Sequence, residues 1–306
     1  MFIFGQYCLK MNRIKSSGFC AELLLVLAAI VWGFAFVAQK AGMEDIGPMA
    51  FNGIRFLLGS ISLFPLIWYY DKKGNFVKQK SSKNKELWKA GFISGLVLFV
   101  AASVQQIGIV YTTAGNAGFI TSMYVILVPV FGLAFKQRVN MQTWIGVVIA
   151  LTGLYFLSVS EGLVLVIGDL LVFGSAFFWA AHVLLASYYA PKVNVIRLAA
   201  IQFGVTGILS LIISFFTESY GFENIYAAAI PLLYGGLMSV GLGFTLQLVA
   251  QQKANPTHAA IILSTESVFA AIGGWLILNE LLTTIETVGA GLMLTGVVLS
   301  QLKKKI

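Results

Sequence analysis

The segment THAAIILSTESVFAAIGGWLIL, residues 257–278, decides the fold class. It is apolar over the length of about 20 residues that an α-helix needs to cross the hydrocarbon core of a bilayer. The strands of a membrane β-barrel are about half as long and alternate between apolar and polar residues, which this segment does not. We therefore predict a transmembrane helix that carries a single charged residue, Glu266, near its middle.

Nine further segments have the same character. The ten predicted spans are residues 21–39, 49–69, 90–111, 114–135, 143–159, 169–189, 196–216, 228–251, 257–278 and 286–302. The composition agrees with them, because 58% of the 306 residues are hydrophobic and only 10% are charged, against about a quarter charged in soluble domains. A chain this apolar is neither a soluble globule nor intrinsically disordered. The sequence predicts an all-α membrane protein with ten transmembrane helices.

Lysine and arginine predict the orientation of the chain in the membrane. A formal charge of +8 would suggest nucleic-acid binding in a soluble protein. Here all but two of the 20 basic residues, Lys40 and Arg55, fall in segments that share one side of the membrane when the spans are threaded in order. The positive-inside rule makes that side cytoplasmic, with both termini on it, in a plasma or inner membrane. No nucleic-acid partner is predicted.

The segments outside the spans offer little chemistry. Residues 1–20 form a basic lead, within which Met11 is a second candidate start, and residues 303–306 form a basic tail. The sequence has no glycine-rich phosphate loop, no Cys-x-x-Cys pair and no histidine pair at metal-binding spacing. We therefore expect no cofactor, no metal ion and no enzymatic activity. The expected partners are the lipid bilayer and a small-molecule substrate.

The two halves of the chain repeat each other. Residues 21–160 and 167–302 each hold five predicted spans, and matched positions keep their order along both halves. The matched pairs include Trp32 with Trp179, Arg55 with Gln202, Gln106 with Gln247 and Gly153 with Gly296. Because five is odd, the second half enters the membrane from the opposite side, which makes an inverted-topology repeat around a central cavity. Such repeats usually serve alternating access, with a passive membrane scaffold as the alternative.

Four stretches of the sequence are recognisable. They are WGFAFVAQK at residues 32–40, RFLLGS at 55–60, AGFITSMYVILVPVFGL at 117–133, and NPTHAAIILSTESVFAAIGGWLILNELLTTIETVGAGLMLTGVVLS at 255–300. They resemble the EamA family of the drug/metabolite transporter superfamily, as two EamA units that cover nearly the whole chain after about residue 21. The resemblance implies a ten-helix, exporter-like permease for small organic metabolites, amino acids or xenobiotics. It also implies a central cavity lined chiefly by the first, third and fourth helices of each half.

Two positions depart from the family pattern. The ninth helix of the family usually carries Glu-Pro, where this chain has Glu266 followed by Ser267. The Gly-Glu-Arg that often ends the fourth helix is replaced by Lys-Gln-Arg at residues 136–138. No proline therefore supports a kink after Glu266, whereas Pro129 supplies a break point in the fourth span.

Seven polar or aromatic residues deep within the predicted spans are the candidate substrate-binding residues: Trp32, Gln106, Tyr124, Trp179, His182, Gln247 and Glu266. Glu266 is the strongest, because a carboxylate in the middle of an isolated span costs at least about 2.5–3.5 kcal/mol and should face a cavity or the bundle. It would contact a substrate amine or carry a coupling proton. His182, three residues after Trp179, is the second candidate for proton coupling.

Structural interpretations of the same residues stay open. A neutral, hydrogen-bonded Glu266 or His182 would hold helices together, tryptophans would pack them, and glutamines would join them. Arg55, which lies inside the second span, is expected to snorkel to the outer surface.

We therefore predict a transporter, and more narrowly an exporter, of amino acids or amphipathic drug-like compounds that works by alternating access. Proton antiport and facilitated diffusion both stay open, and so does a homodimer. A lipid-linked sugar flippase or an organophosphate antiporter of the same superfamily is the alternative, but each would need basic residues at a phosphate site, and Arg55 is the only clear intramembrane cation.

Overall fold

The computed structural model describes residues 14–73, 81–134, 140–159, 167–278 and 283–301, and its regular elements are all helices. The lead up to residue 13, residues 136–138 and the basic tail lie outside this part of the chain. The helices are α2 (Ile14–Gly42), α3 (Pro48–Ser62), α4 (Phe64–Lys72), α5 (Ser81–Val110), α6 (Ala114–Thr121), α7 (Tyr124–Ala134), α8 (Met141–Val159), α9 (Ile167–Tyr189), α10 (Val195–Thr217), α11 (Phe222–Ala227), α12 (Ala229–Leu233), the π-helix η1 (Tyr234–Phe244), α13 (Thr245–Gln251), α14 (Pro256–Leu263), α15 (Glu266–Leu278) and α16 (Thr284–Gln301).

These helices correspond to the ten predicted spans. α3 with α4, α6 with α7, α14 with α15, and α12 with η1 and α13 each make one span, and α2, α5, α8, α9, α10 and α16 each make one alone. Eight spans of the described chain are long and apolar enough to cross a bilayer, while α8 and α16 carry the shorter apolar stretches Met141–Gly153 and Thr287–Leu299. The predicted all-α membrane fold is confirmed.

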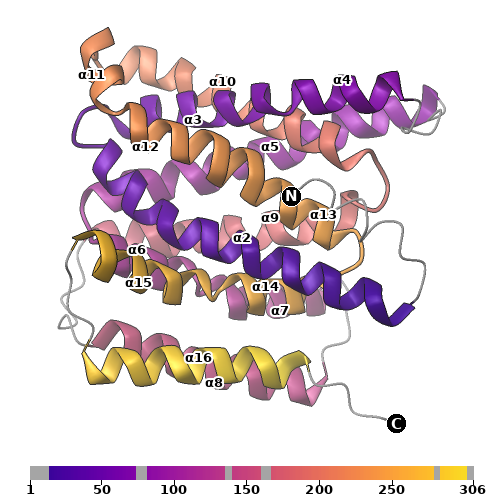
Figure 1. The fold of residues 1–306 in the computed structure, drawn as a ribbon, viewed down its shortest axis with the longest axis vertical. Coiled ribbons are helices and arrows are strands. Elements are labelled where there is room, and N and C mark those ends of the chain that lie inside the picture. The colour runs from indigo at the N-terminus through magenta and orange to yellow at the C-terminus, as the bar shows by residue number, and fades with distance from the viewer. Residues whose placement is uncertain (1–13, 74–80, 135–139, 160–166, 279–282, 302–306) are drawn as a thin grey trace.

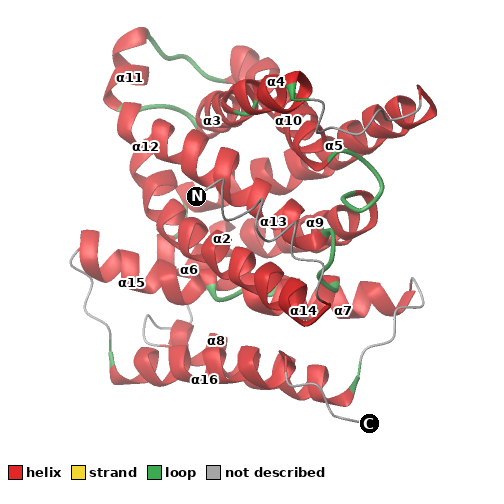
Figure 2. Ribbon diagram, turned by 45° about the vertical axis from the view of Figure 1, so that its right-hand side comes forward, coloured by secondary structure: helices red, strands yellow, loops and turns green. Residues whose placement is uncertain are grey.

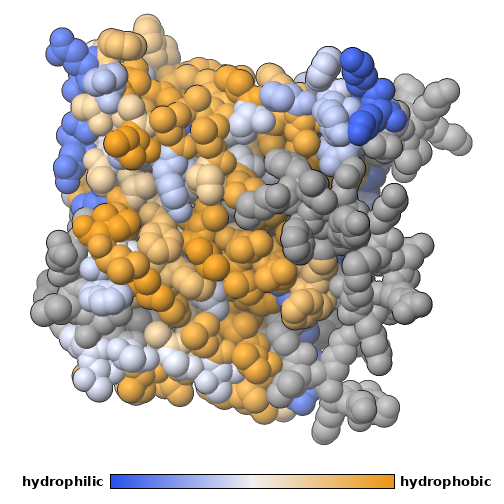
Figure 3. Space-filling view, viewed as in Figure 1, coloured by the Kyte–Doolittle hydropathy of each residue, from blue (hydrophilic) through white to orange (hydrophobic). Residues whose placement is uncertain are grey.

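The spans run side by side, so the loops gather at two ends of the molecule (Figures 1 and 2). α2, α5 and α10 finish at one end, which we call the Lys40 face, and α4, α9 and α13 finish at the other, which we call the Asp71 face. Figure 3 shows apolar side chains across the middle of the visible surface and hydrophilic ones near its ends. This distribution suits a protein whose middle is surrounded by hydrocarbon. Basic residues gather at the Asp71 face, namely Lys72, Lys73, Lys85, Lys89, Lys192, Arg197 and Lys253.

The fourth and the ninth span are each interrupted near the middle. α6 gives way to α7 at residues 122–123, and α14 gives way to α15 at residues 264–265. The hydroxyls of Ser122 and Ser264 each donate to a carbonyl oxygen of the preceding turn, at 2.9 Å in both cases. Such side-chain bonds compete with the backbone ladder and bend helices. The break expected at Pro129 therefore lies earlier, with Pro129 inside α7, and the ninth span breaks without a proline.

The two interruptions contact each other at the centre of the bundle. The hydroxyl of Ser122 also donates to the carbonyl oxygen of Ser264, at 3.1 Å. Tyr124 is the first residue of α7 and Glu266 is the first residue of α15, so the two occupy equivalent positions in the two repeats. The pseudo-two-fold axis of the inverted repeat therefore passes between the breaks and brings a phenol and a carboxyl to the same region.

The helices α8 and α16 pack against each other at the edge of the bundle (Figure 1). A Cβ atom added at Gly153 would lie 2.5 Å from the carbonyl oxygen of Gly289, and one added at Gly296 would lie 2.6 Å from that of Gly146. The contact is therefore reciprocal between matched positions of the repeat. Glycine is needed here because two helix backbones approach too closely for any larger side chain.

Replacement of Gly153 by leucine should push α8 away from α16. The new side chain would meet backbone atoms of Gly289 and Met293, which cannot move aside as a flexible side chain can. We expect the free energy of unfolding to fall by about 1–3 kcal/mol, measured by denaturation of the purified protein in detergent. Gly291 of α16 is the matched control, because a Cβ added there meets nothing within 4 Å. Equal losses in Gly153→Leu and Gly291→Leu would contradict this account.

Candidate functional site

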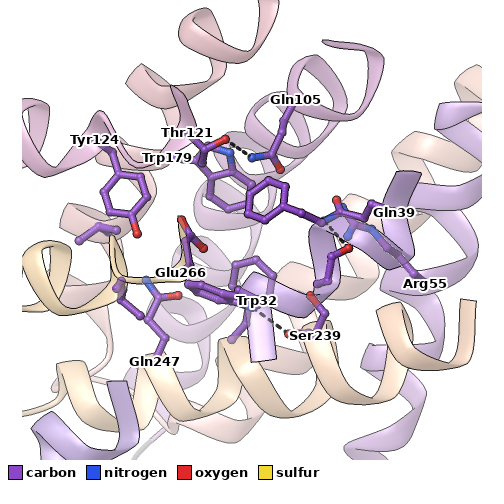
Figure 4. A pocket seen from close by; sticks show the side chains of 15 residues that line it. Trp32, Gln39, Arg55, Gln105, Thr121, Tyr124, Trp179, Ser239, Gln247 and Glu266 are labelled. Atoms are coloured by element: carbon purple, nitrogen blue, oxygen red, sulfur yellow. Dashed lines mark hydrogen bonds between the residues drawn. The ribbon is translucent and has the colours of Figure 1, made fainter. Parts of the chain in front are cut away.

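A cavity lies at the centre of the bundle, next to the two helix breaks (Figure 4). Its volume is about 40 Å³, whereas pockets that hold small organic ligands measure about 300–1,000 Å³. A space of this size accommodates a few water molecules and no metabolite. In this structure the cavity is therefore too small to hold such a ligand.

Both repeats contribute to the cavity wall. The polar lining residues are Gln39, Arg55, Gln105, Thr121, Tyr124, Ser239, Gln247 and Glu266. The apolar lining residues are Trp32, Ala35, Phe36, Trp179, Val183, Phe244 and Leu263. The first, third and fourth spans of each repeat supply most of these side chains, as the family resemblance implies, and Arg55 of the second span adds a charge.

Three aromatic rings form one wall of the cavity. The ring of Phe244 lies 4.5 Å from that of Trp32 and stacks on that of Trp179 at 5.8 Å. Both matched tryptophans therefore pack against the same phenylalanine. The Trp32 indole donates to the carbonyl oxygen of Ser239 at 3.1 Å. Gly243 permits this approach, because a Cβ atom there would lie 2.6 Å from the indole nitrogen. The wall is rigid and suits an apolar or aromatic group of a ligand.

Glu266 and Tyr124 occupy the wall formed by the helix breaks. Only 4% of Glu266 and 3% of Tyr124 is exposed, and Figure 4 shows the Tyr124 hydroxyl directed toward the Glu266 carboxyl on this wall. Glu266 also lies in the first turn of α15, where the helix dipole favours a negative charge. Within the described chain no basic side chain forms an ion pair with it. The carboxyl is thus a polar group that a ligand can contact.

Arg55 is buried, and the prediction that it snorkels to the surface is wrong. Only 3% of it is exposed, and its guanidinium lies over the rings of Phe51 and Phe56, 5.6 and 5.1 Å from their centroids. Its Nε donates to the side-chain oxygen of Asn52 at 3.0 Å. Cation–π contacts and this hydrogen bond compensate part of the loss of hydration, which is why the side chain can turn inward.

Side-chain amides complete the polar lining. Gln105 donates to the Thr121 hydroxyl at 2.7 Å, and Gln39 donates to the carbonyl oxygen of Ala35 at 3.1 Å. The side-chain oxygen of Gln247 is buried without a hydrogen-bond partner among the described residues. An amide oxygen left in this state is ready to accept a hydrogen bond from a ligand or from water.

Five of the seven predicted site residues line the cavity, and two do not. Gln106 lies outside it, and its amide nitrogen approaches the Met43 sulfur at 3.0 Å. His182 is fully buried and does not line the cavity; its ring lies edge-on to that of Trp179, and its Nε2 lies 3.3 Å from the side-chain oxygen of Gln202. The structure therefore separates the two predicted proton-coupling residues, and only Glu266 borders the cavity.

Sequence reasoning did not select Phe244, Ser239 or Gln39. Phe244 and Ser239 belong to η1, a glycine-rich π-helix whose wider turn gives a register that the apolar pattern of the span does not reveal. Gln39 lies near the end of its span, and its only signal in the sequence is a polar amide in an apolar helix. Arg55 carried a stronger signal, since an arginine inside a span marks a functional site by default.

Two sets of contacts close the bundle on either side of the cavity. At the Lys40 face, the Lys40 ammonium donates to the carbonyl oxygens of Ile109, Val110 and Thr112 at 2.9, 3.1 and 2.9 Å, which ties the end of α2 to the end of α5. At this face the Thr112 hydroxyl also donates to Asp169 at 2.6 Å. We call the three lysine bonds the Lys40 latch.

The equivalent contact at the Asp71 face involves Gln251. Its side-chain nitrogen donates to the carbonyl oxygen of Val183 at 3.0 Å and to the Ser187 hydroxyl at 2.8 Å, which ties the end of α13 to the end of α9. The alignment that matches Trp32 with Trp179 also matches Lys40 with Ser187. We call this contact the Gln251 latch. It joins the helices that are equivalent to α2 and α5 at the other end of the inverted fold, with the donor on the other helix of the pair.

The site offers several kinds of contact to a ligand. It combines a carboxyl, a guanidinium, amides and an aromatic wall around one cavity. Among the residues that the structure describes, no group of three or more histidine, cysteine or acidic side chains could hold a metal ion.

Known proteins resemble this chain over nearly its whole length. The model of the EamA-like transporter family matches residues 20–159 and again residues 166–302. An uncharacterized transporter of Archaeoglobus fulgidus is 32% identical, with 99% of this chain and 95% of that protein covered. The uncharacterized transporter YoaV of Bacillus subtilis is 27% identical, with 89% and 94% covered. A solved crystal structure superposes with a TM-score of 0.73 over 92% of this chain and 96% of the other, at 16% identity, which shows a shared fold.

Proposed function

Because this chain belongs to the EamA-like transporter family, we propose that it exports a small organic metabolite through the central cavity by alternating access. The observation that carries the proposal is the cavity itself. Matched residues from two inverted repeats, among them Trp32 and Trp179, meet there beside two broken helices. Broken helices at the interface between inverted repeats are where transporters place their substrate.

The remaining parts of the proposal follow from charge and symmetry. We place the two repeats at residues 21–160 and 167–302, and we assign the Asp71 face, where the basic residues gather, to the cytoplasm of a cell whose plasma or inner membrane holds the protein. Substrate enters from that face, the latches close around it, and the Lys40 latch then opens. A gradient of substrate is sufficient to drive this cycle, and Glu266 is the residue through which a proton would be coupled. The cycle requires no second copy of the chain.

The composition of the wall indicates the kind of substrate. An aromatic layer for an apolar body, together with Glu266 and several amides, suits an amphipathic molecule of the size of an amino acid. A phosphate-bearing lipid or sugar would require several cations, and Arg55 is the only basic residue of the described chain that lines the cavity. We therefore favour a small amphipathic metabolite over the flippase and organophosphate alternatives.

The proposal is tested by efflux from liposomes that contain the purified protein. The liposomes are loaded with a labelled mixture of amino acids, amines and organic acids. Efflux of at least one compound should exceed that from protein-free liposomes. Trp179→Ala should slow this efflux about 2- to 10-fold, because a stacked aromatic contact is worth about 0.5–1.5 kcal/mol. Trp88→Ala, at an exposed tryptophan, is the matched control. Absence of efflux for every compound would contradict transport, whereas equal rates in both variants would contradict the site.

A further inference from the structure

Neighbouring side chains outside the cavity hold Arg55 in one orientation. The side-chain oxygen of Asn52 accepts its Nε–H, and the side-chain nitrogen of Asn52 is itself fixed by donating to the carbonyl oxygen of Ala102 at 3.0 Å. Rings of Phe51 and Phe56 pack on the guanidinium. These contacts use the inner N–H of the guanidinium and leave its two terminal NH₂ groups for the cavity that Arg55 lines.

The charge of this guanidinium is not neutralised by the protein. Arg55 is 3% exposed, and no carboxylate oxygen of the described residues lies within 4 Å of it. Glu266 lines the same cavity but forms no ion pair with it, and Figure 4 shows the two side chains well apart. A buried cation without a counter-ion is costly, so it is expected where a ligand supplies the negative charge.

We propose that Arg55 is the anion-binding subsite of the cavity and that it holds the carboxylate of the transported molecule. The inference rests on the proposed function and names the group that the substrate carries. A guanidinium presents paired N–H donors that match the two oxygens of a carboxylate. A single positive charge, with the Glu266 carboxyl in the same cavity, suits a monoanion better than a doubly charged phosphate. An amine on the same molecule would then be directed toward Glu266.

The test compares ligands that differ only in the anionic group. The probes are leucine and leucinamide, 4-methylpentanoate and 4-methylpentanamide, and inorganic phosphate. Affinity is measured for the full chain in detergent as the ligand concentration that gives half of the maximal rise in melting temperature. In the wild-type protein each carboxylate should bind about tenfold or more tightly than its amide, because a hydrogen bond to a charged group is lost in the amide.

Variants of Arg55 locate the effect. The tenfold ratio should fall to about one in Arg55→Gln and to an intermediate value in Arg55→Lys, which keeps the charge and loses the paired donors. Lys192→Gln, which removes an exposed positive charge at the Asp71 face, should keep the full ratio. If Arg55→Gln does not fold, the Arg55→Lys ratio decides.

Three results would overturn the inference. The first is a wild-type protein that binds no carboxylate more tightly than its amide, and the second is a ratio that survives in the Arg55 variants. The third is Arg55-dependent binding of inorganic phosphate without binding of any carboxylate. In each case, efflux that still depends on Trp179 would leave the proposed transport function standing, so the two failures can be told apart.

Discussion

Glu266→Gln is expected to slow transport by about 10- to 100-fold. The substitution keeps the shape of the side chain and removes its acid, and a hydrogen bond to a charged group contributes about 1.5–3 kcal/mol, where 1.4 kcal/mol is a factor of ten. Glu266 borders the cavity at the first turn of α15, and no basic side chain of the described residues forms an ion pair with it, so its acid can interact with the substrate. The measurement is the initial rate of substrate efflux from liposomes.

Two further variants make the result specific. Glu266→Asp retains the acid on a shorter stem and should recover part of the rate, which a purely structural role would not predict. Glu223→Gln removes an acid from the exposed helix α11 at the Lys40 face and should transport like the wild type. Wild-type efflux in Glu266→Gln, with the protein folded, would remove Glu266 from the site and leave the glutamine lining to be tested in its place.

The fold was predictable because the bilayer imposes a single strong constraint. Each span must be about 20 apolar residues long, and the ten segments read from the sequence correspond to the helices of the structure. The inverted repeat was predictable for the same reason, since five spans per half fix the direction of the second half. Matched glycines confirm it geometrically, because Gly153 contacts α16 as Gly296 contacts α8.

The helix breaks were harder to predict, because proline is the usual signal and these breaks do not use it. Serine hydroxyls at Ser122 and Ser264 bind backbone carbonyls instead, and a serine in a span is more often only a packing residue. Pro129 therefore directed the prediction to the wrong turn. The signal that could have found the breaks is the repeat, because serine recurs at the same position of both halves.

The depth of a residue along its span is predictable from the sequence. The side of the helix on which its side chain lies is harder to predict. Trp32, Trp179, Tyr124, Gln247 and Glu266 lie inside their predicted spans and line one cavity. His182 lies one turn from Trp179, yet its Nε2 lies 3.3 Å from the side-chain oxygen of Gln202 in α10, a partner that the pattern of the α9 sequence does not reveal. Apolar residues surround these helices on all sides, because lipid and the cavity wall are both apolar. The sequence pattern therefore does not show which side of a helix faces the cavity.

Disruption of the two latches is expected to shift the equilibrium between opening at the Lys40 face and opening at the Asp71 face in opposite directions. Lys40→Met keeps most of the length of the side chain but removes three charge-assisted bonds to carbonyls at and just after the end of α5. Those carbonyls are the negative end of a helix, where an ammonium is favoured. We expect the Lys40 face to open at least about tenfold more often, because each bond to a charged group contributes about 1.5–3 kcal/mol in one state only.

Gln251→Leu should do the reverse and to a smaller extent. It removes two neutral hydrogen bonds to α9, worth about 0.5–1.5 kcal/mol each, and so should favour opening at the Asp71 face. A cysteine at Ser239, in a background without the native cysteines, reports both events, because this residue lines the cavity. Labelling by a membrane-impermeant thiol reagent is compared for reagent added outside oriented vesicles and reagent trapped inside them.

Inverted symmetry makes the sign of each change the decisive result. Lys40→Met should raise labelling of the Ser239 cysteine from the Lys40 side and lower it from the other, whereas Gln251→Leu should do the opposite. Lys192→Met, at an exposed lysine that lies over the Tyr188 ring, should change neither. A passive scaffold would show no reciprocal change, because it has no equilibrium between two open states for the latches to bias. Labelling that moves in the same direction in both latch variants would therefore argue against alternating access itself.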